Sequence, residues 1–205
     1  RHGLFPLMPY RIWRDAVPVE DGVDVVAFLR TLKPIDHDVV ERKLPIPGFV
    51  LDSFPEPRDL KPTAPEPGDA SYGAYVIARS ACMECHTDAD NRGNFIAPPF
   101  SGGREFAVPK PGKGFVRTAN LTPDADTGLG KWTKEMFVAK FKASTLDAAR
   151  ALPLDDTGYN SIMPWWAYAG LTEEDLGAIF DYLHALPPTK NAVVKWSATP
   201  KNAPK

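Results

Sequence analysis

The chain of 205 residues contains only two cysteines, Cys82 and Cys85. A zinc site built from two such pairs is therefore excluded, because the chain offers no second pair of thiols. No apolar run approaches the roughly 20 residues that a membrane-spanning helix requires. The net charge is only −2, which is far from the strong charge field typical of nucleic-acid binding. We expect a soluble globular protein with no membrane span and no nucleic-acid partner.

Proline, in contrast, is abundant, with 22 residues or about twice the usual share. Proline interrupts helix interiors and central strands because its ring fixes the backbone and removes a hydrogen-bond donor. The composition therefore predicts long ordered loops and little sheet. The length suits one domain of ordinary size or two small ones.

Both cysteines belong to one run, Cys82-Met83-Glu84-Cys85-His86. The pattern C-x-x-C-H is the attachment signature of c-type haem. Two thiols at this spacing can each form a thioether to one porphyrin edge, and the next residue, His86, is then held under the iron as the proximal axial ligand. The alternatives are half of a zinc site and a redox dithiol, which is expected near a βαβ pattern that this sequence lacks. We favour one covalently bound haem c.

A haem iron held by His86 needs a sixth ligand or keeps an open position. The remaining methionines and histidines are the candidates: Met8, Met83, Met136, Met163, His2, His37 and His184. Met83 lies between the cysteines and cannot reach the opposite haem face, while Met136 and His184 fall within expected helices. Met163 lies in a loop, before a proline and just ahead of the terminal helix, which favours it as the distal ligand. Ligation by histidine and methionine favours electron transfer over oxygen chemistry.

Three helices are expected around this site. The first spans residues 69–80 with Asp69 as its cap and leads directly into Cys82. Gly73 inside it costs about 1 kcal/mol relative to alanine, so we expect another helix to cross there closely. The second helix opens at Thr133 and places Met136, Phe137 and Phe141 in the core.

The terminal helix follows Thr172, which begins a pattern like a capping box, and it ends near residue 185 before two prolines. Its apolar residues at helical spacing are Leu176, Ile179, Phe180, Leu183 and Leu186. The segment between His86 and about residue 130 is rich in glycine and proline. We expect these loops to fold onto the porphyrin, which serves as their apolar core.

Residues 1–34 resemble the C-terminal part of the chain. A Met-Pro pair at residues 8–9 precedes a helical pattern at 25–34, as the pair at 163–164 precedes the pattern at 178–188, with an offset of about 155 residues. Such an internal repeat predicts two related units, although a chance recurrence is the alternative. We expect residues 1–34 to be the C-terminal remnant of a preceding haem domain whose own C-x-x-C-H is absent from this chain. A second haem would require the missing part of that domain.

Several further motifs accompany the C-x-x-C-H run, and together they are specific. They are Ser101–Phe106, Ala119–Asp124, Thr127–Trp132, Met163–Trp165 and Leu171–Leu176. With these motifs, residues 68 to about 194 resemble a bacterial class I cytochrome c. More specifically, they resemble the multi-haem cytochrome c subunits of membrane-associated alcohol, gluconate and FAD-dependent sugar dehydrogenases.

The resemblance implies an all-α haem fold with long loops wrapped on the haem, and His86 and Met163 as axial ligands. It also implies that the carbonyl of Pro98 accepts a hydrogen bond from the second nitrogen of His86. Asn120 and Trp132 are expected beside the haem propionates. The resulting organisation is a remnant at 1–34, a proline-rich connector at 35–67, a cytochrome c domain at 68–190 and a polar tail at 191–205 that is expected to fray.

The expected function is that of an electron carrier rather than an enzyme. A partner dehydrogenase subunit would reduce the haem, and a downstream cytochrome or oxidase would take the electron. The expected location is the periplasm or the outer face of a bacterial cytoplasmic membrane; since no leader begins at Arg1, we expect a mature or trimmed product. The alternatives are a haem enzyme, such as a peroxidase or a small-sulfur-compound oxidoreductase with a labile sixth ligand, and a purely structural module.

Overall fold

The computed structural model describes residues 18–38, 63–90, 93–108, 114–151 and 161–201. The chain divides into two compact units, Arg1–Glu66 and Pro67–Lys205, and each is described by itself. Within the residues described, no helix is both long and apolar enough to cross a membrane.

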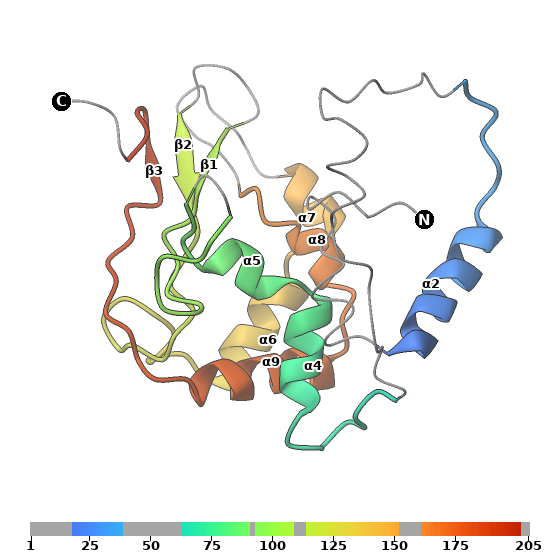
Figure 1. Ribbon diagram of the computed structural model, residues 1–205, viewed down its shortest axis with the longest axis horizontal. Coiled ribbons are helices and arrows are strands. Elements are labelled where there is room, and N and C mark those ends of the chain that lie inside the picture. Colours follow the sequence, from blue (N-terminus) through green and yellow to red (C-terminus); the bar gives the residue numbers. More distant parts are fainter. Residues whose placement is uncertain (1–17, 39–62, 91–92, 109–113, 152–160, 202–205) are drawn as a thin grey trace, which may run out of the picture. The chain divides into compact units, whose positions relative to one another are not determined.

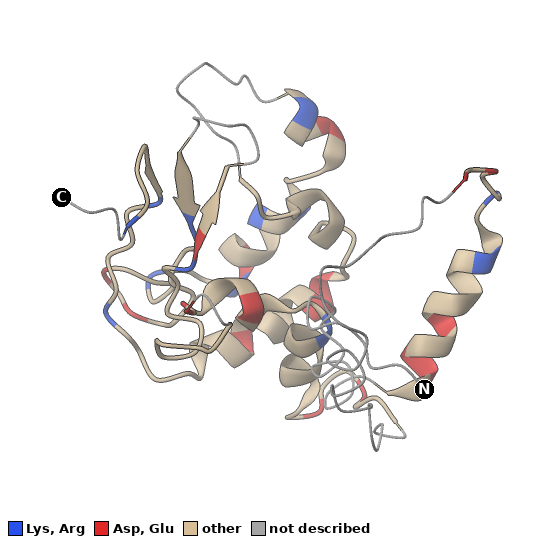
Figure 2. Ribbon diagram, turned by 45° about the horizontal axis from the view of Figure 1, so that its top comes forward, with Lys and Arg blue, Asp and Glu red and all other residues tan. Residues whose placement is uncertain are grey.

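The first unit contributes helix α2, Val19–Thr31, which includes most of the helical pattern expected at residues 25–34. Acidic residues occupy its first turn and Arg30 its last, as the helix macrodipole favours (Figure 2). None of its described residues is buried, and its apolar side chains are exposed. The Met-Pro pair at 8–9 and most of the connector lie outside the described residues.

The second unit is rich in helix and has little sheet (Figure 1). Its elements, in chain order, are α4 (Tyr72–Arg79), α5 (Cys82–His86), β1 (Glu105–Ala107), β2 (Phe115–Arg117), α6 (Lys134–Lys142), α7 (Leu146–Ala151), α8 (Trp165–Tyr168), α9 (Glu173–His184) and β3 (Trp196–Ser197).

The starts of the helices agree with the sequence signals in two cases of three. Thr133 caps α6 by accepting a hydrogen bond from the backbone of Met136, and Thr172 forms a capping box with Asp175 at the start of α9. The expected cap at Asp69 is wrong, because α4 begins three residues later, after Ser71. Residue 69 instead offers its backbone carbonyl to the amide of Tyr72 at 2.9 Å.

The core lies where α4, α6 and α9 pack together. The buried apolar side chains of these helices are Tyr75, Val76, Ile77, Phe137, Phe141, Leu176, Ile179, Phe180 and Leu183. Phe137 connects α6 to α9, with its ring 5.6 Å from that of Phe180. The core position expected for Met136 is wrong: this residue is 50% exposed, while its neighbour Phe137 is buried and packs against Phe180 of α9.

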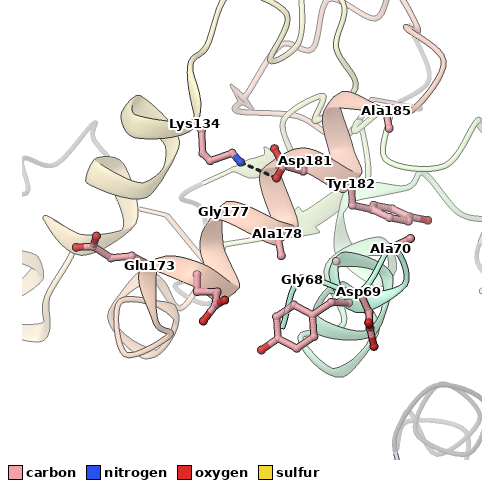
Figure 3. A pocket seen from close by; sticks show the side chains of 13 residues that line it. Gly68, Asp69, Ala70, Lys134, Glu173, Gly177, Ala178, Asp181, Tyr182 and Ala185 are labelled. Carbon is pink, nitrogen blue, oxygen red and sulfur yellow. Dashed lines mark hydrogen bonds and ion pairs between the residues drawn. The ribbon is translucent and has the colours of Figure 1, made fainter. Parts of the chain in front are cut away.

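Helices α4 and α9 cross closely at Gly73, as the sequence predicted. A Cβ atom added at Gly73 would collide with the backbone carbonyl of Ala178 and would lie 3.0 Å from the Cβ of Tyr182. Figure 3 shows Ala178 and Tyr182 on the side of α9 that faces α4. The absence of a side chain at residue 73 therefore sets the distance between the two helices.

Asp175, in the first turn of α9, forms a buried polar connection to α4. Its carboxylate accepts a hydrogen bond from the hydroxyl of Tyr72 at 2.6 Å and pairs with Arg79 at 3.4 Å. Burial by itself would raise the pKa of Asp175, but hydrogen bonds from Tyr72 and Thr172 outweigh burial and hold this pKa below its ordinary value. The same contact, together with burial, raises the pKa of Tyr72 to about 12.

A small three-stranded antiparallel sheet is present beside the helices, which agrees with the prediction of little sheet. β2 lies in the middle, with Phe106 opposite Val116 on one side and Trp196 opposite Val116 on the other. Arg117 of β2 pairs with Glu105 of β1 at 2.6 Å. The strands have two or three residues each, which is too short to give a recognisable alternation in the sequence.

The polar tail is also more ordered than predicted over residues 191–201. The amide of Asn191 donates to the hydroxyl of Thr127 at 2.9 Å, and Lys201 pairs with Asp88 at 2.6 Å. Because β3 belongs to this segment, backbone pairing holds it to the rest of the unit and the expected fraying does not occur there.

Replacing Gly73 with alanine is expected to destabilise the second unit by about 2 kcal/mol or more, because the backbone of Ala178 cannot move away without separating α4 from α9. Gly177→Ala is the matched control on α9, since its Cβ would meet only the side chain of Lys134 at 3.4 Å. Urea unfolding followed by circular dichroism measures both. Equal stability of the two variants would contradict the close crossing.

Replacing Asp175 with asparagine is expected to lower the free energy of unfolding at pH 7 by about 1–3 kcal/mol. The pKa of Asp175 is lower in the folded chain than in the unfolded chain. Its contribution is therefore complete above the unfolded pKa of about 3.9 and is lost as the pH falls through the folded pKa.

The difference between the parent chain and Asp175→Asn should thus shrink as the pH is lowered from about 7 to about 3. Asp181→Asn makes the same change at an exposed ion pair with Lys134 and should alter stability by less than about 1 kcal/mol. A pH-independent difference for Asp175→Asn would contradict the assigned ionisation.

Candidate haem-binding site

A tight turn at Ser80 and Ala81 connects α4 to α5. Ala81 adopts the left-handed conformation, with φ 52° and ψ 31°, which costs a residue with a side chain roughly 1–2 kcal/mol. The amide of Ala81 donates to the carbonyl of Ala78 at 3.0 Å, and the amide of Glu84 donates to the carbonyl of Ala81 at 3.2 Å. The turn thereby starts a new helix at Cys82.

Helix α5 consists of the five residues of the C-x-x-C-H run. Cys82 and Cys85 are three residues apart on a helix, so their thiols lie on the same face. Both thiols are free; Cys82 is half-buried and Cys85 is exposed. His86 is the last residue of the helix and is buried.

Two hydrogen bonds hold His86. The Nδ1 atom of its ring lies 2.8 Å from the carbonyl oxygen of Ala119, and its own backbone carbonyl accepts from the amide of Gly102 at 2.8 Å. Because a carbonyl oxygen can only accept, Nδ1 carries the proton and Nε2 keeps a lone pair. Nε2 makes no hydrogen bond with any of the residues that the structure describes, which leaves it available to a metal.

Gly102 brings the loop after α5 against the segment that holds His86. Its φ of +75° favours glycine, and a Cβ atom there would collide with the backbone of Ala119 and Asn120. The acceptor of the His86 ring and the donor to the His86 backbone are therefore packed directly on each other.

Burial shifts the pKa values of both cysteines and of His86. Burial, with the neighbouring Cys85, raises the pKa of Cys82 to about 12, and burial also raises the pKa of Cys85. Reactive dithiols have lowered pKa values. Burial lowers the pKa of His86, against the opposing effect of the Ala119 hydrogen bond, so the imidazole is neutral as an iron ligand must be. Two thiols and one free imidazole nitrogen match the donor set of haem c.

Met163, the expected distal ligand, is half-buried and has its backbone fixed on both sides. Its amide donates to the hydroxyl of Ser161 at 3.1 Å, and its carbonyl accepts from the amide of Trp165 at 2.8 Å. Pro164 between them has φ −77° and ψ 64°, the geometry of an inverse γ-turn. These bonds fix the local backbone conformation of Met163 immediately before α8.

The partner of His86 differs from the one expected. The carbonyl of Pro98 accepts instead from the amide of Ser101 at 3.2 Å and from its hydroxyl at 2.8 Å. The ring of His86 is hydrogen-bonded instead to the backbone carbonyl of Ala119. No side-chain signal in the sequence could have indicated that residue.

Asn120 uses its whole side chain within the protein. Its amide group donates to the hydroxyl of Thr127 at 3.1 Å and to the carbonyl of Thr189 at 2.7 Å, and its oxygen accepts from the amide and hydroxyl of Thr122. Both amide hydrogens are used within the protein in this arrangement, and the place of Asn120 beside a haem propionate stays a prediction. Trp132 is half-buried, its backbone amide donates to Leu129, and its place beside a propionate stays a prediction.

Arg104 is a residue at this site that the motif analysis did not single out. Its guanidinium donates to the backbone carbonyl of Glu84, lies 4.0 Å from the carboxylate of Glu84 and favours the charged form of Cys85. A cation at the C-terminal end of a helix is favourable. Its proximity to α5 depends on the fold of the 101–106 loop, which local pattern does not predict.

Other candidate sites are weaker. Across the described ranges, no group of three or more histidine, cysteine or acidic side chains could hold a metal ion by itself. A groove of about 550 Å³ beside the α4–α9 crossing is lined by residues that include Gly68, Lys134 and Tyr182 (Figure 3). It contains no residue of α5 and not Met163, so it is distinct from the haem-binding residues.

Comparison with known proteins agrees with this geometry. The cytochrome subunit of fructose dehydrogenase from Gluconobacter japonicus is 31% identical over 129 residues, which cover 60% of this chain and 23% of that protein. The cytochrome c subunit of gluconate 2-dehydrogenase from Pantoea cypripedii is 31% identical over 121 residues, covering 58% of this chain and 24% of that protein. The chain resembles the cytochrome c subunits of bacterial dehydrogenases.

Other similarities extend over nearly the whole sequence. The cytochrome c subunit of a quinone alcohol dehydrogenase from Gluconacetobacter polyoxogenes is 23% identical over 220 aligned residues, covering 99% of this chain and 46% of that protein. No protein family model matches the chain. The chain spans about a quarter of the length of the first two relatives and about half of the third.

Proposed function

We propose that the chain is an electron-transfer protein that carries one haem c. Cys82 and Cys85 attach the porphyrin, His86 is the proximal ligand and Met163 the distal ligand of the iron. The observation that carries this proposal is the hydrogen bond from His86 Nδ1 to the carbonyl of Ala119, because it leaves Nε2 free on the helix that bears both thiols.

The bound haem would supply reversible one-electron chemistry at its iron. The protein supplies the two axial ligands and fixes their orientation. Ala119 and Gly102 hold the His86 imidazole in one tautomer and one orientation, and the inverse γ-turn holds the backbone of Met163. With both axial positions taken by side chains, no position is open for oxygen or peroxide.

The similarity to dehydrogenase subunits supports a place in an electron-transfer chain. We infer that a dehydrogenase subunit of a larger complex reduces the haem, and that a downstream cytochrome or oxidase oxidises it. Covalent attachment of haem to C-x-x-C-H is an extracytoplasmic process, so we infer a location in the periplasm or on the outer face of the bacterial cytoplasmic membrane. Residues 68–190 form the haem domain of this proposal.

We also infer that residues 1–34 repeat the C-terminal part of the haem domain. In the pairing of the two patterns, Leu29 of α2 corresponds to Leu183 of α9. Leu183 is 1% exposed, whereas Leu29 is 55% exposed. An α9-like helix with its core face uncovered is expected from a remnant of a second, similar domain.

Met163→Ala is the test of the electron-carrier proposal. Removing the thioether should abolish the long-wavelength absorption band of the oxidised haem that methionine ligation produces, and it should lower the reduction potential. The reduced protein should then bind carbon monoxide stoichiometrically. Met136→Ala removes an exposed methionine and is the matched control.

An unchanged spectrum and potential in Met163→Ala would contradict methionine ligation by this residue. Carbon monoxide binding by the parent protein at the level of the variant would favour a haem enzyme with an open sixth position.

The repeat is tested by truncating the two corresponding leucines. Leu183→Ala should lower the free energy of unfolding by about 2–5 kcal/mol, because it opens a cavity in a packed core. Leu29→Ala should change the free energy of unfolding by less than about 0.5 kcal/mol, because the side chain is already largely exposed to water. Urea unfolding measures both, and an equal loss would show that the face of α2 is already covered.

A further inference from the structure

A hydrogen bond of the described residues joins the two segments that carry the expected iron ligands. The hydroxyl of Tyr168 donates to the backbone carbonyl of Ser80 at 2.8 Å. Tyr168 is the last residue of α8, which starts two residues after Met163. Ser80 lies in the turn between α4 and α5, two residues before Cys82.

The acceptor is a carbonyl that a helix end leaves available. Ser80 follows the last residue of α4, and the next residue, Ala81, turns the chain away in the left-handed conformation. Carbonyl groups at the C-terminal end of a helix lack intrahelical donors. Tyr168 supplies a donor to Ser80 from a residue 88 positions away in the chain.

Helix α8 depends on such contacts for its position. It has four residues and no side-chain N-cap, and none of its residues is buried. A helix this short is not stable by itself. The ring of Phe141 lies 5.0 Å from that of Trp165 and 6.4 Å from that of Tyr168. Lys142 donates to the carbonyls of Ala169, at 3.3 Å, and Leu171.

These contacts have different partners. Phe141 and Lys142 both belong to α6, so they fix α8 relative to the helical core. The Tyr168 contact fixes α8 relative to the turn that positions Cys82 and His86. Tyr168 lies close enough to both cysteines to interact with them electrostatically, and burial raises its pKa to about 12. The hydroxyl therefore stays protonated and able to donate near neutral pH.

We propose that Tyr168 is a positioning residue for the distal ligand: its hydrogen bond to Ser80 sets how closely the Met163 segment approaches the haem-bearing helix. This inference rests on the proposed function, since it takes Met163 as the ligand. It adds a residue that would control how often the methionine leaves the iron.

The test is Tyr168→Phe in the haem-loaded protein, with cyanide as the probe of the oxidised form. Cyanide must displace the methionine, so its binding rate reports how often the methionine leaves. We expect the rate to rise about fivefold, the factor that corresponds to loss of one neutral hydrogen bond. The reduction potential should fall, because a weaker thioether bond favours oxidised iron.

Tyr182→Phe is the matched control. It removes the same hydroxyl from α9, where Tyr182 packs edge-on against Phe100 at 6.0 Å, and it leaves the Ser80 contact intact. Its cyanide rate should equal that of the parent protein. If Tyr168→Phe loads haem poorly, the cyanide rate is measured on the fraction of this variant that carries haem, which its visible absorbance identifies, so that the inference stays testable.

The outcomes separate the inference from the function on which it rests. If the parent protein shows methionine ligation, Met163→Ala loses it and Tyr168→Phe binds cyanide at the parent rate, the inference is overturned and the function stands. A lower unfolding midpoint for Tyr168→Phe with an unchanged cyanide rate would mean a merely structural role and would also overturn it. If Met163→Ala retains the parent spectrum, the function and the inference fail together.

Discussion

The hydrogen bond between the His86 ring and the carbonyl of Ala119 is the contact on which the site depends. It determines which ring nitrogen is protonated and which is left for iron. It also joins α5 to a segment that starts 33 residues later in the chain. Gly102 packs in the same place, donating to the His86 backbone while its missing side chain makes room for Ala119. The loops between α5 and α6 thus have a structural task, since they carry the acceptor that orients the ligand.

The helices provide a frame for this contact. Gly73 allows α4 to approach α9, and the buried carboxylate of Asp175 ties the start of α9 to Tyr72 of α4. Helix α4 leads directly into the Ser80–Ala81 turn. The packing of α4 against α9 therefore determines where this turn places Cys82. On the opposite side, α6 holds α8 through Phe141 and thereby holds the segment of Met163. The two segments that bear the expected iron ligands are therefore both set by the same three-helix core.

Sequence reasoning succeeded where the signal is local. The caps at Thr133 and Thr172 and the close crossing at Gly73 are each indicated by a few neighbouring residues, and the structure confirms them. The haem site at the C-x-x-C-H run stays a prediction. It failed where contacts join distant segments. Ala119 acts through its backbone, so its identity carries no signal, and the strands of the sheet are too short to show alternation. The hydrogen bonds of Asn120 to Thr122 and to the carbonyl of Thr189 likewise join separate parts of the chain, and no local pattern predicts them.

The measurement that tests the central claim most directly combines the intact mass of the purified chain with visible spectra of its oxidised and reduced forms. The account predicts the added mass of one haem, a low-spin spectrum and the long-wavelength band of methionine ligation in the oxidised form. A chain without haem would contradict the covalent site at Cys82 and Cys85. A high-spin spectrum with one haem attached would contradict ligation by both His86 and Met163, and with it the role of a simple electron carrier.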